Sequence, residues 1–190
     1  MSGNKIGIVH GRFQPLHNGH LNDYILKAKE KCDFIIVGIT NPDPTHTLPD
    51  VVNLARSSAY NNPLNYFERL SIIQSALIDS GLKHSEFTIV PFPINIPQIL
   101  KYYIPQDAVH YLTIFDEWGD SKSNSLSQYG YRTEILFKKD ISEKVISSTL
   151  VRERIIKNKN WKELVPSTSV RIIEGFNLKE RLLKIKNQMR

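Results

Sequence analysis

Short apolar runs alternate with helical patterns along the first part of this chain. Lys5–His10 and Asp33–Thr40 are runs rich in β-branched residues, which is typical of buried strands. Between them, Asn18–Lys31 places Leu21, Ile25 and Ala28 on one face of a predicted helix. A strand, a helix and a second strand within 40 residues predict a parallel pair of strands joined by a right-handed crossover.

The rest of the chain continues the same alternation. Tyr66–Ser80 has apolar residues at helical spacing, including Phe67 and Leu77, and Gly81 follows at the position where helices commonly end. Asn41–Asn65 contains four prolines and reads as a long loop. The remaining predicted elements are a helical turn in Val51–Tyr60, strands at Phe87–Val90, Ala108–Phe115 and Thr133–Phe137, and helices at Ile96–Tyr103, Ser148–Asn158, Trp161–Leu164 and Val170–Asn187.

This order of elements predicts an α/β fold with a mainly parallel sheet, helices on both faces and a helical C-terminal segment. The 190 residues suit one domain, with an α/β core over 1–145 and C-terminal helices over 146–190. In such sheets ligands bind beyond the carboxyl ends of the strands. The first predicted strand ends just before Gly11, so we expect the site there.

Composition narrows the functional classes. The net charge is +6, and the segment from Lys138 onward carries 14 Lys and Arg against 6 Asp and Glu. This basic third suits an anionic partner, although charge alone favours the simpler explanation, the solvated surface of amphipathic helices. The single cysteine, Cys32, cannot form a disulfide framework, a zinc cluster or an iron–sulfur site. No apolar run reaches membrane-helix length and the first residues lack a signal-peptide pattern, so we expect a cytoplasmic protein.

The stretch Gly11–His20 carries the strongest chemical signal. It reads GRFQPLHNGH and connects a predicted strand to a predicted helix for which Asn18 is the expected N-cap. A helix N-terminus favours phosphate, and His17, His20 and Arg12 add donors beside it. Two histidines three residues apart are by themselves often incidental or structural. Half of a metal site is a weaker reading of the pair.

A second phosphate-type motif lies about 130 residues further on. Ile146–Arg152 reads ISSTLVR, with hydroxyl residues at the start of a predicted helix and Arg152 one turn inside it. Hydroxyls, helix amides and an arginine together form an anion-binding site, although Ser-Ser-Thr alone is an ordinary helix cap.

Both motifs resemble those of the nucleotidylyltransferase superfamily with the HxGH signature. GRFQPLHNGHL is most similar to nicotinamide-mononucleotide adenylyltransferases of the archaeal type, and ISSTLVR is similar to the ISSTxxR element of the superfamily. The resemblance implies a Rossmann-like nucleotidylyltransferase fold. It implies His17, His20 and Arg152 as catalytic residues. The implied nucleotide-binding residues are Gly11, Arg12, Phe13, Gly19, Ser147, Ser148 and Thr149.

The acceptor half of the site departs from that family. Where the family usually has Gly-Ser-Ala-Gln after the second strand, this chain continues from Thr40 and Asn41 into a proline-rich loop. Pro63–Ile73 resembles a family segment that makes Arg69 a phosphate-ligand candidate. Asp116 offers a carboxylate, and Trp118 offers a ring face for stacking or packs under the long loop. The predicted acceptor-binding residues are Arg69, Asp116, Trp118, Thr40 and Asn41.

The implied reaction is direct transfer of a nucleotidyl group with release of pyrophosphate. The resemblance implies ATP and nicotinamide mononucleotide as substrates, with NAD as product, and Mg²⁺ held mainly by the triphosphate. The ISSTxxR form, unlike the RTEGISTS-like form of cytidylyltransferases, favours ATP. The alternative is transfer from CTP or ATP to another phosphate or phosphonate acceptor. A nucleotide sensor or a nucleic-acid-binding protein is the non-enzymatic alternative, but the chain lacks an aromatic–basic nucleic-acid signature. No membrane partner is expected, and the family commonly forms homo-oligomers.

Overall fold

The computed structural model contains one five-stranded sheet in which every strand is parallel to its neighbours. It describes residues 5–44, 58–114, 117–138 and 146–188, and for 117–122 it describes the backbone alone. The strand order is β3-β2-β1-β4-β5. The strands are β1 Ile6–Gly11, β2 Phe34–Ile39, β3 Phe87–Pro91, β4 Val109–Ile114 and β5 Arg132–Lys138.

Helices connect the strands and follow the last of them. A continuous helical segment after β1 consists of α1, a π-helical stretch and α2. Among the residues that the structure describes, short 3₁₀ helices occupy Ala59–Asn61, His84–Glu86, Pro97–Tyr102 and Lys162–Leu164. The longer elements are α1 Asn18–His20, the π-helical Leu21–Leu26, α2 Lys27–Lys29, α3 Tyr66–Asp79, α4 Glu117–Gln128, α5 Ser148–Ile156, α6 Ser167–Gly175 and α7 Leu178–Gln188.

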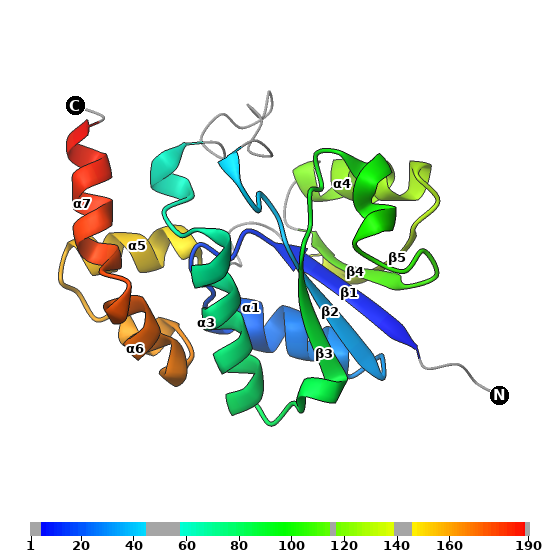
Figure 1. Ribbon diagram of the computed structural model, residues 1–190, viewed down its shortest axis with the longest axis horizontal. Coiled ribbons are helices and arrows are strands. Elements are labelled where there is room, and N and C mark those ends of the chain that lie inside the picture. The colour runs from blue at the N-terminus through cyan, green and yellow to red at the C-terminus, as the bar shows by residue number, and fades with distance from the viewer. Residues whose placement is uncertain (1–4, 45–57, 115–116, 139–145, 189–190) are drawn as a thin grey trace.

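The strand order explains the layers of the molecule. The chain moves from β1 to β2 to β3 in one direction, so right-handed crossovers place α1 and α3 on the same face of the sheet. It then crosses to β4 and β5 on the other side of β1, which places α4 on the opposite face (Figure 1). The C-terminal helices α5, α6 and α7 pack outside the α1 and α3 layer (Figure 1). The fold is therefore an α/β fold with a parallel sheet, helices on both faces and a C-terminal helical segment, as the sequence predicted.

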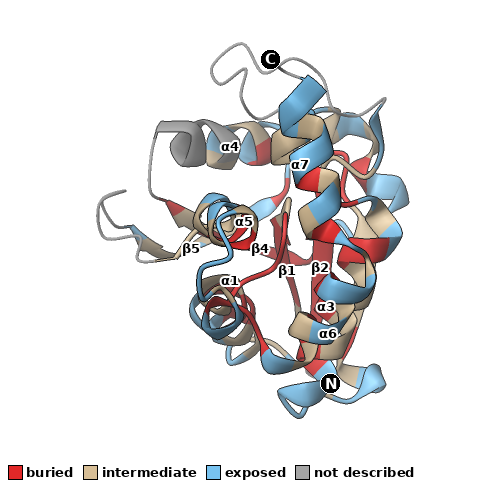
Figure 2. Ribbon diagram, turned by 90° about the vertical axis from the view of Figure 1, so that its left-hand side faces the viewer, coloured by how far each residue is buried: buried red, intermediate tan, exposed pale blue. Residues whose placement is uncertain are grey.

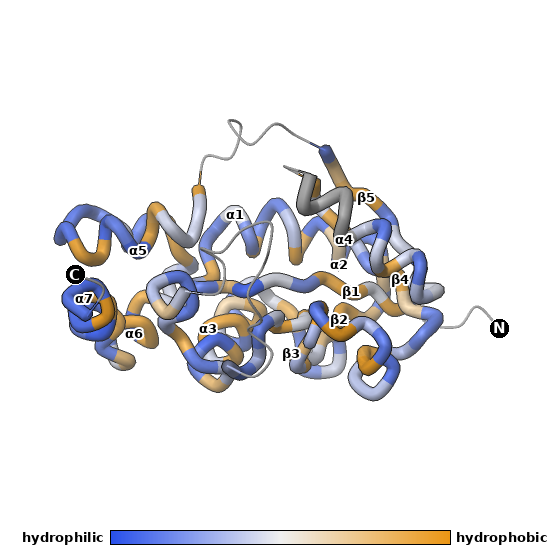
Figure 3. Tube along the Cα trace, turned by 90° about the horizontal axis from the view of Figure 1, so that it is seen from above, coloured by the Kyte–Doolittle hydropathy of each residue, from blue (hydrophilic) through white to orange (hydrophobic). Residues whose placement is uncertain are grey.

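The core is largest on the face that α1 and α3 cover. One buried cluster joins the strands to the π-helical stretch Leu21–Leu26, α3 and the C-terminal helices, and includes Val9, Ile25, Ile73, Val151 and Leu182. A smaller cluster on the α4 face includes Ile8, Phe92 and Leu126. Most residues of β1, β2 and β4 are buried (Figure 2). Hydrophobic stretches follow these strands, while α5 and α7 alternate in hydropathy (Figure 3). The C-terminal helices thus complete the main core.

Several sequence-based elements needed correction. Phe67 was expected in the apolar face of α3 but is 67% exposed, because Ile72, Ile73, Ala76 and Leu77 form the buried face. The predicted single helix over Val170–Asn187 is two helices, α6 and α7, separated at Asn177, whose φ of 51° is left-handed. Helix α4 was not predicted at all.

The sheet opens between β1 and β4. Their pairing contains only Gly7 with Val109 and Ile8 with His110, although both strands continue beyond these residues. Here the hydroxyl of Tyr24 accepts from the backbone N–H of His10 at 3.1 Å and donates to the carbonyl of Tyr111 at 2.9 Å. This is the point where the strand order reverses, and ligands of parallel α/β sheets bind at that point.

An ion pair between α3 and α7 is expected to make stability depend on pH. Arg181 donates two bonds to the Glu68 carboxylate, at 2.6 and 2.7 Å. Burial raises the pKa of Glu68, but bonds from Arg181 and the Asn65 amide outweigh burial and lower the pKa overall. Because the folded pKa is depressed, the stabilisation is present above the unfolded pKa of about 4.3 and is lost as the pH falls through the folded pKa.

We therefore expect Glu68→Gln to lower the free energy of unfolding by about 1–3 kcal/mol at pH 7, the range for bonds between charged groups. The loss should shrink as the pH falls below about 4.3. Urea denaturation at pH 7 and at a pH below about 4.3 measures the free energy of unfolding of both proteins. Glu163→Gln is the matched control, because Glu163 pairs with Arg154 at an exposed position. A pH-independent loss for Glu68→Gln would contradict this role of the ion pair.

Candidate active site

The loop between β1 and α1 ends in a histidine that caps the following helix. His17 has extended backbone angles, and its ring Nδ1 accepts from the backbone N–H of His20 at 3.2 Å. The N-cap is therefore His17, and the sequence-based assignment of the cap to Asn18 was wrong. The side chain of Asn18 instead donates to the carbonyl of Glu163 at 2.9 Å, because the C-terminal segment lies beside this helix start.

The two motif histidines form a stacked pair. Their ring centroids lie 3.6 Å apart with 21° between the planes. Because Nδ1 of His17 accepts a bond, the proton of the neutral ring lies on Nε2, which can donate to a ligand. A Cβ on Gly19 would lie 3.3 Å from the His17 ring, so glycine leaves room for this close packing. The pair can therefore present imidazole donors beside a helix N-terminus.

The ring of Phe13 packs against the histidine pair. Its ring meets that of His20 edge-on at 5.2 Å, and the side chain is 1% exposed. A Cβ on Gly11 would lie 3.0 Å from the Phe13 ring, so Gly11 makes room for it. The predicted role of Phe13 in nucleotide binding stays a prediction. The buried ring of Phe13 packs against His20 and so supports its position.

The second motif contacts the first directly. Ser147 caps α5 by accepting from the N–H of Leu150 at 3.1 Å. The hydroxyl of Ser148 donates to the carbonyl of Pro15 at 2.9 Å, and Arg152 donates to the carbonyl of Gln14 at 2.7 Å. Two motifs about 130 residues apart therefore meet at the carboxyl end of β1. An anion placed there would face α1 and α5 together.

Arg152 is one of the largest fully buried side chains, with 1% of its surface exposed. Besides the Gln14 carbonyl, it donates to the amide oxygen of Asn61 and to the hydroxyl of Thr149. Its guanidinium carbon lies 5.5 Å from the centroid of the Tyr60 ring. Burial lowers the pKa of Arg152 from its ordinary value. In this arrangement the cation is enclosed by polar and aromatic groups.

Arg69 holds the loops that follow β1 and β2. Its guanidinium donates to the carbonyls of Arg12, Thr40 and Asn41 at 2.7 to 3.0 Å, and to that of Asn65 at 3.1 Å. Burial lowers the pKa of Arg69 to about 10, while Tyr66 raises it and the charge of Arg12 lowers it further. A phosphate contact by Arg69 stays a prediction, as do acceptor contacts by Thr40 and Asn41. What the sequence did not indicate is that Arg69 ties these loops together.

The other acceptor predictions lie beyond the described atoms. Asp116 lies outside the described residues, and for Trp118 only the backbone position in α4 is described. Because α4 follows β4, this part of the chain leaves the sheet on the side opposite α1. Their roles in acceptor binding stay predictions.

Two site residues were missed from the sequence. The Gln14 side chain forms a reciprocal pair with the backbone of Leu64, each bond 2.9 Å long. Asn61 contacts Arg152 from a segment read as loop. Gln14 could have been suspected, because it lies inside the motif, whereas no local pattern marks Asn61.

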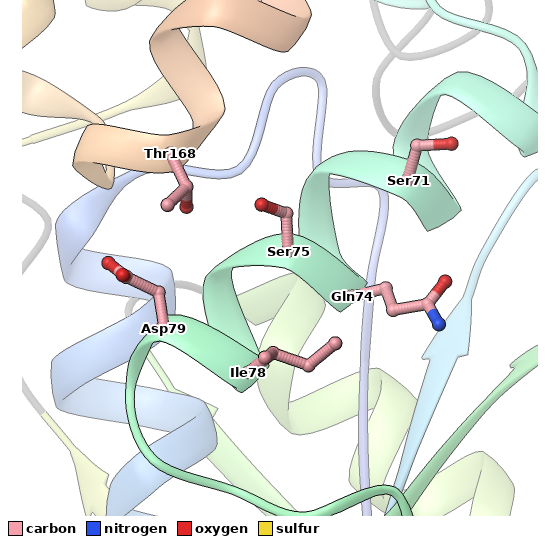
Figure 4. Close-up of a pocket in the computed structure, with 6 residues that line it drawn as sticks. All are labelled: Ser71, Gln74, Ser75, Ile78, Asp79 and Thr168. Atoms are coloured by element: carbon pink, nitrogen blue, oxygen red, sulfur yellow. The ribbon is translucent and has the colours of Figure 1, made fainter.

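A separate pocket lies between α3 and α6, away from these residues. Its volume is about 420 Å³, and Figure 4 shows Ser71, Gln74, Ser75, Ile78, Asp79 and Thr168 around it. None of the predicted site residues lines it, although α3, which carries Arg69, forms one of its sides. Within the described ranges, no group of three His, Cys, Asp or Glu residues is placed to hold a metal ion. Within the same ranges, no helix has the length and apolarity to cross a membrane.

Comparisons with known proteins show the family to which the chain is similar. Residues 8–154 match a family model described as cytidylyltransferase-like, a range that includes both motifs. The chain is 38% identical over 176 residues to phosphonoformate cytidylyltransferase of Streptomyces viridochromogenes, covering 93% of this chain and 94% of the relative. It is 31% identical over 182 residues to nicotinamide-nucleotide adenylyltransferase of Thermococcus sibiricus, covering 93% and 87%.

Among solved structures, the chain resembles a bifunctional NMN adenylyltransferase/ADP ribose pyrophosphatase from Francisella tularensis. The TM-score is 0.67 at 16% identity, over 97% of this chain. The match spans about half of that protein, 54% of its chain. At this identity the likeness supports the fold alone.

Proposed function

This chain belongs to the cytidylyltransferase-like family, and on that basis we propose that it transfers a nucleotidyl group to a small phosphonate- or phosphate-bearing acceptor. The donor is a nucleoside triphosphate and the second product is pyrophosphate. The observation that carries this proposal is the meeting of the two phosphate motifs, where Ser148 and Arg152 bond the carbonyls of Pro15 and Gln14.

For the substrates, we place CTP and a phosphonate acceptor first. The support is the 38% identity to a phosphonoformate cytidylyltransferase over nearly the whole length of both chains. That relative carries more weight than the form of the ISSTLVR element, which favours ATP. Adenylyl transfer to nicotinamide mononucleotide is the second candidate, supported by relatives of that name at about 31% identity.

In the proposed mechanism an oxygen of the acceptor phosphonate or phosphate attacks the α-phosphorus of the triphosphate. A new P–O bond forms in line with the breaking bond between the α-phosphorus and the oxygen that leaves with pyrophosphate. His17 and His20 donate hydrogen bonds to the phosphoryl oxygens, on which negative charge develops. No covalent enzyme intermediate is required. Mg²⁺, if bound, would neutralise triphosphate charge while held by substrate and water.

The remaining residues position the reactants. Gly11, Arg12 and Gly19 lie on the loop and helix start beside the phosphates, and Arg152 with Ser147–Thr149 contacts the β- and γ-phosphates. Arg69 orients the loops after β1 and β2 through their carbonyls, and those loops carry Arg12, Thr40 and Asn41 toward the acceptor. Trp118 and Asp116 would contact the acceptor from the side of α4. Assembly into a homo-oligomer is a further proposal.

A substrate matrix tests the proposal. Purified protein is given CTP or ATP with phosphonoformate, inorganic phosphate or nicotinamide mononucleotide, and pyrophosphate release is measured with Mg²⁺ present. We expect the highest kcat/KM for CTP with phosphonoformate. A higher value for ATP with nicotinamide mononucleotide would favour the second candidate. No release above a blank without protein, with any pair, would contradict nucleotidyl transfer.

A further inference from the structure

Arg152 is a buried cation whose hydrogen-bond partners are all neutral. They are the carbonyl of Gln14, the amide oxygen of Asn61 and the hydroxyl of Thr149. Its Nε atom is buried and has no hydrogen-bond partner among the described residues. The Tyr60 ring adds a cation–π contact but no charge. A buried guanidinium with neutral partners is stabilised less than one that is paired with an anion.

Asn61 contacts this cation from a separate part of the chain. It ends the Ala59–Asn61 turn, 91 residues from Arg152, whereas Thr149 belongs to the same helix as Arg152. The turn is held by the backbone bonds from Asn61 to Ser58 and from Asn62 to Ala59, at 3.1 Å each. An amide oxygen resembles a phosphate oxygen in accepting from a guanidinium, but it lacks the charge.

We propose that Asn61 is a stand-in for a phosphate oxygen, and that its amide competes with the triphosphate for Arg152. This inference rests on the proposed function, in which Arg152 contacts the β- and γ-phosphates. When the triphosphate binds, a charged oxygen replaces the Asn61 amide on the Arg152 guanidinium, and the Ala59–Asn61 turn moves away. Asn61 is therefore a positioning residue that makes triphosphate binding depend on displacement of this turn.

The competing explanation is that Asn61 only supports Arg152. The two explanations predict opposite changes in triphosphate affinity when the Asn61 side chain is removed. Removing a competitor strengthens triphosphate binding, whereas removing a support leaves Arg152 less well positioned and weakens binding. A nucleoside monophosphate separates the effects further, because it lacks the β- and γ-phosphates that would compete with Asn61.

Calorimetric titration of the full chain with CTP, ATP and CMP provides the test. We expect Asn61→Ala to lower the Kd of the better triphosphate by about three- to tenfold, the scale of the net contribution of one ordinary hydrogen bond, and to leave the Kd of CMP within about twofold. Asn61→Asp places a carboxylate against Arg152, so it should raise the triphosphate Kd by more than about tenfold without lowering Tm. Asn62→Ala is the matched control, because the Asn62 amide donates to the carbonyl of Ser58 in the same turn.

The outcomes separate the role of Asn61 from the proposed function. An unchanged or raised triphosphate Kd in Asn61→Ala overturns the competition, and so does an unchanged Kd in Asn61→Asp. If the native chain binds neither CTP nor ATP, the proposed function is overturned together with this inference. Binding by the native chain with the wrong sign for the Asn61 variants overturns this inference alone.

Discussion

Replacing His20 with alanine is expected to lower kcat by about 10²-fold or more, the scale of a lost transition-state donor. His20 lies in the first turn of the helix after β1, and its ring stacks on that of His17. A donor at this place acts on charge that develops only in the transition state, so the Kd of the triphosphate should change much less than kcat. Steady-state rates of pyrophosphate release, together with calorimetric affinities, measure the two quantities.

The control for this variant is another histidine outside the site. His84 is exposed and lies just before β3, at the opposite edge of the parallel sheet. His84→Ala should therefore keep native kcat and native affinity. Thermal unfolding shows whether His20→Ala keeps its fold, because the ring also packs on Phe13. Near-normal turnover by a folded His20→Ala protein would show that the HxGH assignment is wrong.

Arg152→Ala is expected to weaken triphosphate binding by about 10²-fold, corresponding to the loss of charged hydrogen bonds in a buried place. The affinity for the corresponding monophosphate should fall by less than about threefold, because it lacks the phosphates that Arg152 would hold. Calorimetric titration of both nucleotides measures the ratio. Equal weakening of the two nucleotides would place Arg152 away from the β- and γ-phosphates.

Two further variants separate charge from support. Arg152→Lys keeps the cation but loses the planar fork that bonds both Gln14 and Asn61. Its triphosphate Kd should therefore lie between those of the native protein and Arg152→Ala. Arg154→Ala removes a more exposed arginine of the same helix, which bonds Asn160 and Glu163. Its nucleotide affinities should equal those of the native protein.

The sequence predicted most of the architecture because the parallel sheet is buried on both faces. All five strands were found to within one or two residues, as in Asp33–Thr40 for the observed Phe34–Ile39. Helix α4 was missed because Glu117–Gln128 is mostly polar and has no apolar period to mark it. The division between α6 and α7 was missed because both helices continue one amphipathic pattern, interrupted only by the conformation of Asn177.

For the site, local spacing was enough where function lies in a continuous stretch. His17, His20 and Gly19 follow one another at a strand-to-helix junction, so their proximity follows from the helix period alone. The hydroxyls of Ser147–Thr149 were likewise recognisable as a helix start. Even here the cap was assigned to Asn18, because a histidine ring in the N-cap position is outside the usual preference for Ser, Thr, Asp and Asn.

By itself, therefore, the sequence determined the α/β class, the order of strands and helices along the chain and the two phosphate motifs. Only the tertiary structure decided that Arg152 bonds the carbonyl of Gln14, 138 residues away, and that Arg69 joins the loops after β1 and β2. The physical reason is that these particular contacts end on backbone carbonyls, that of Gln14 for Arg152 and those of Arg12 and Asn41 for Arg69. Every residue carries a carbonyl, so no residue type along the chain marks the partner, and the fold alone selects it.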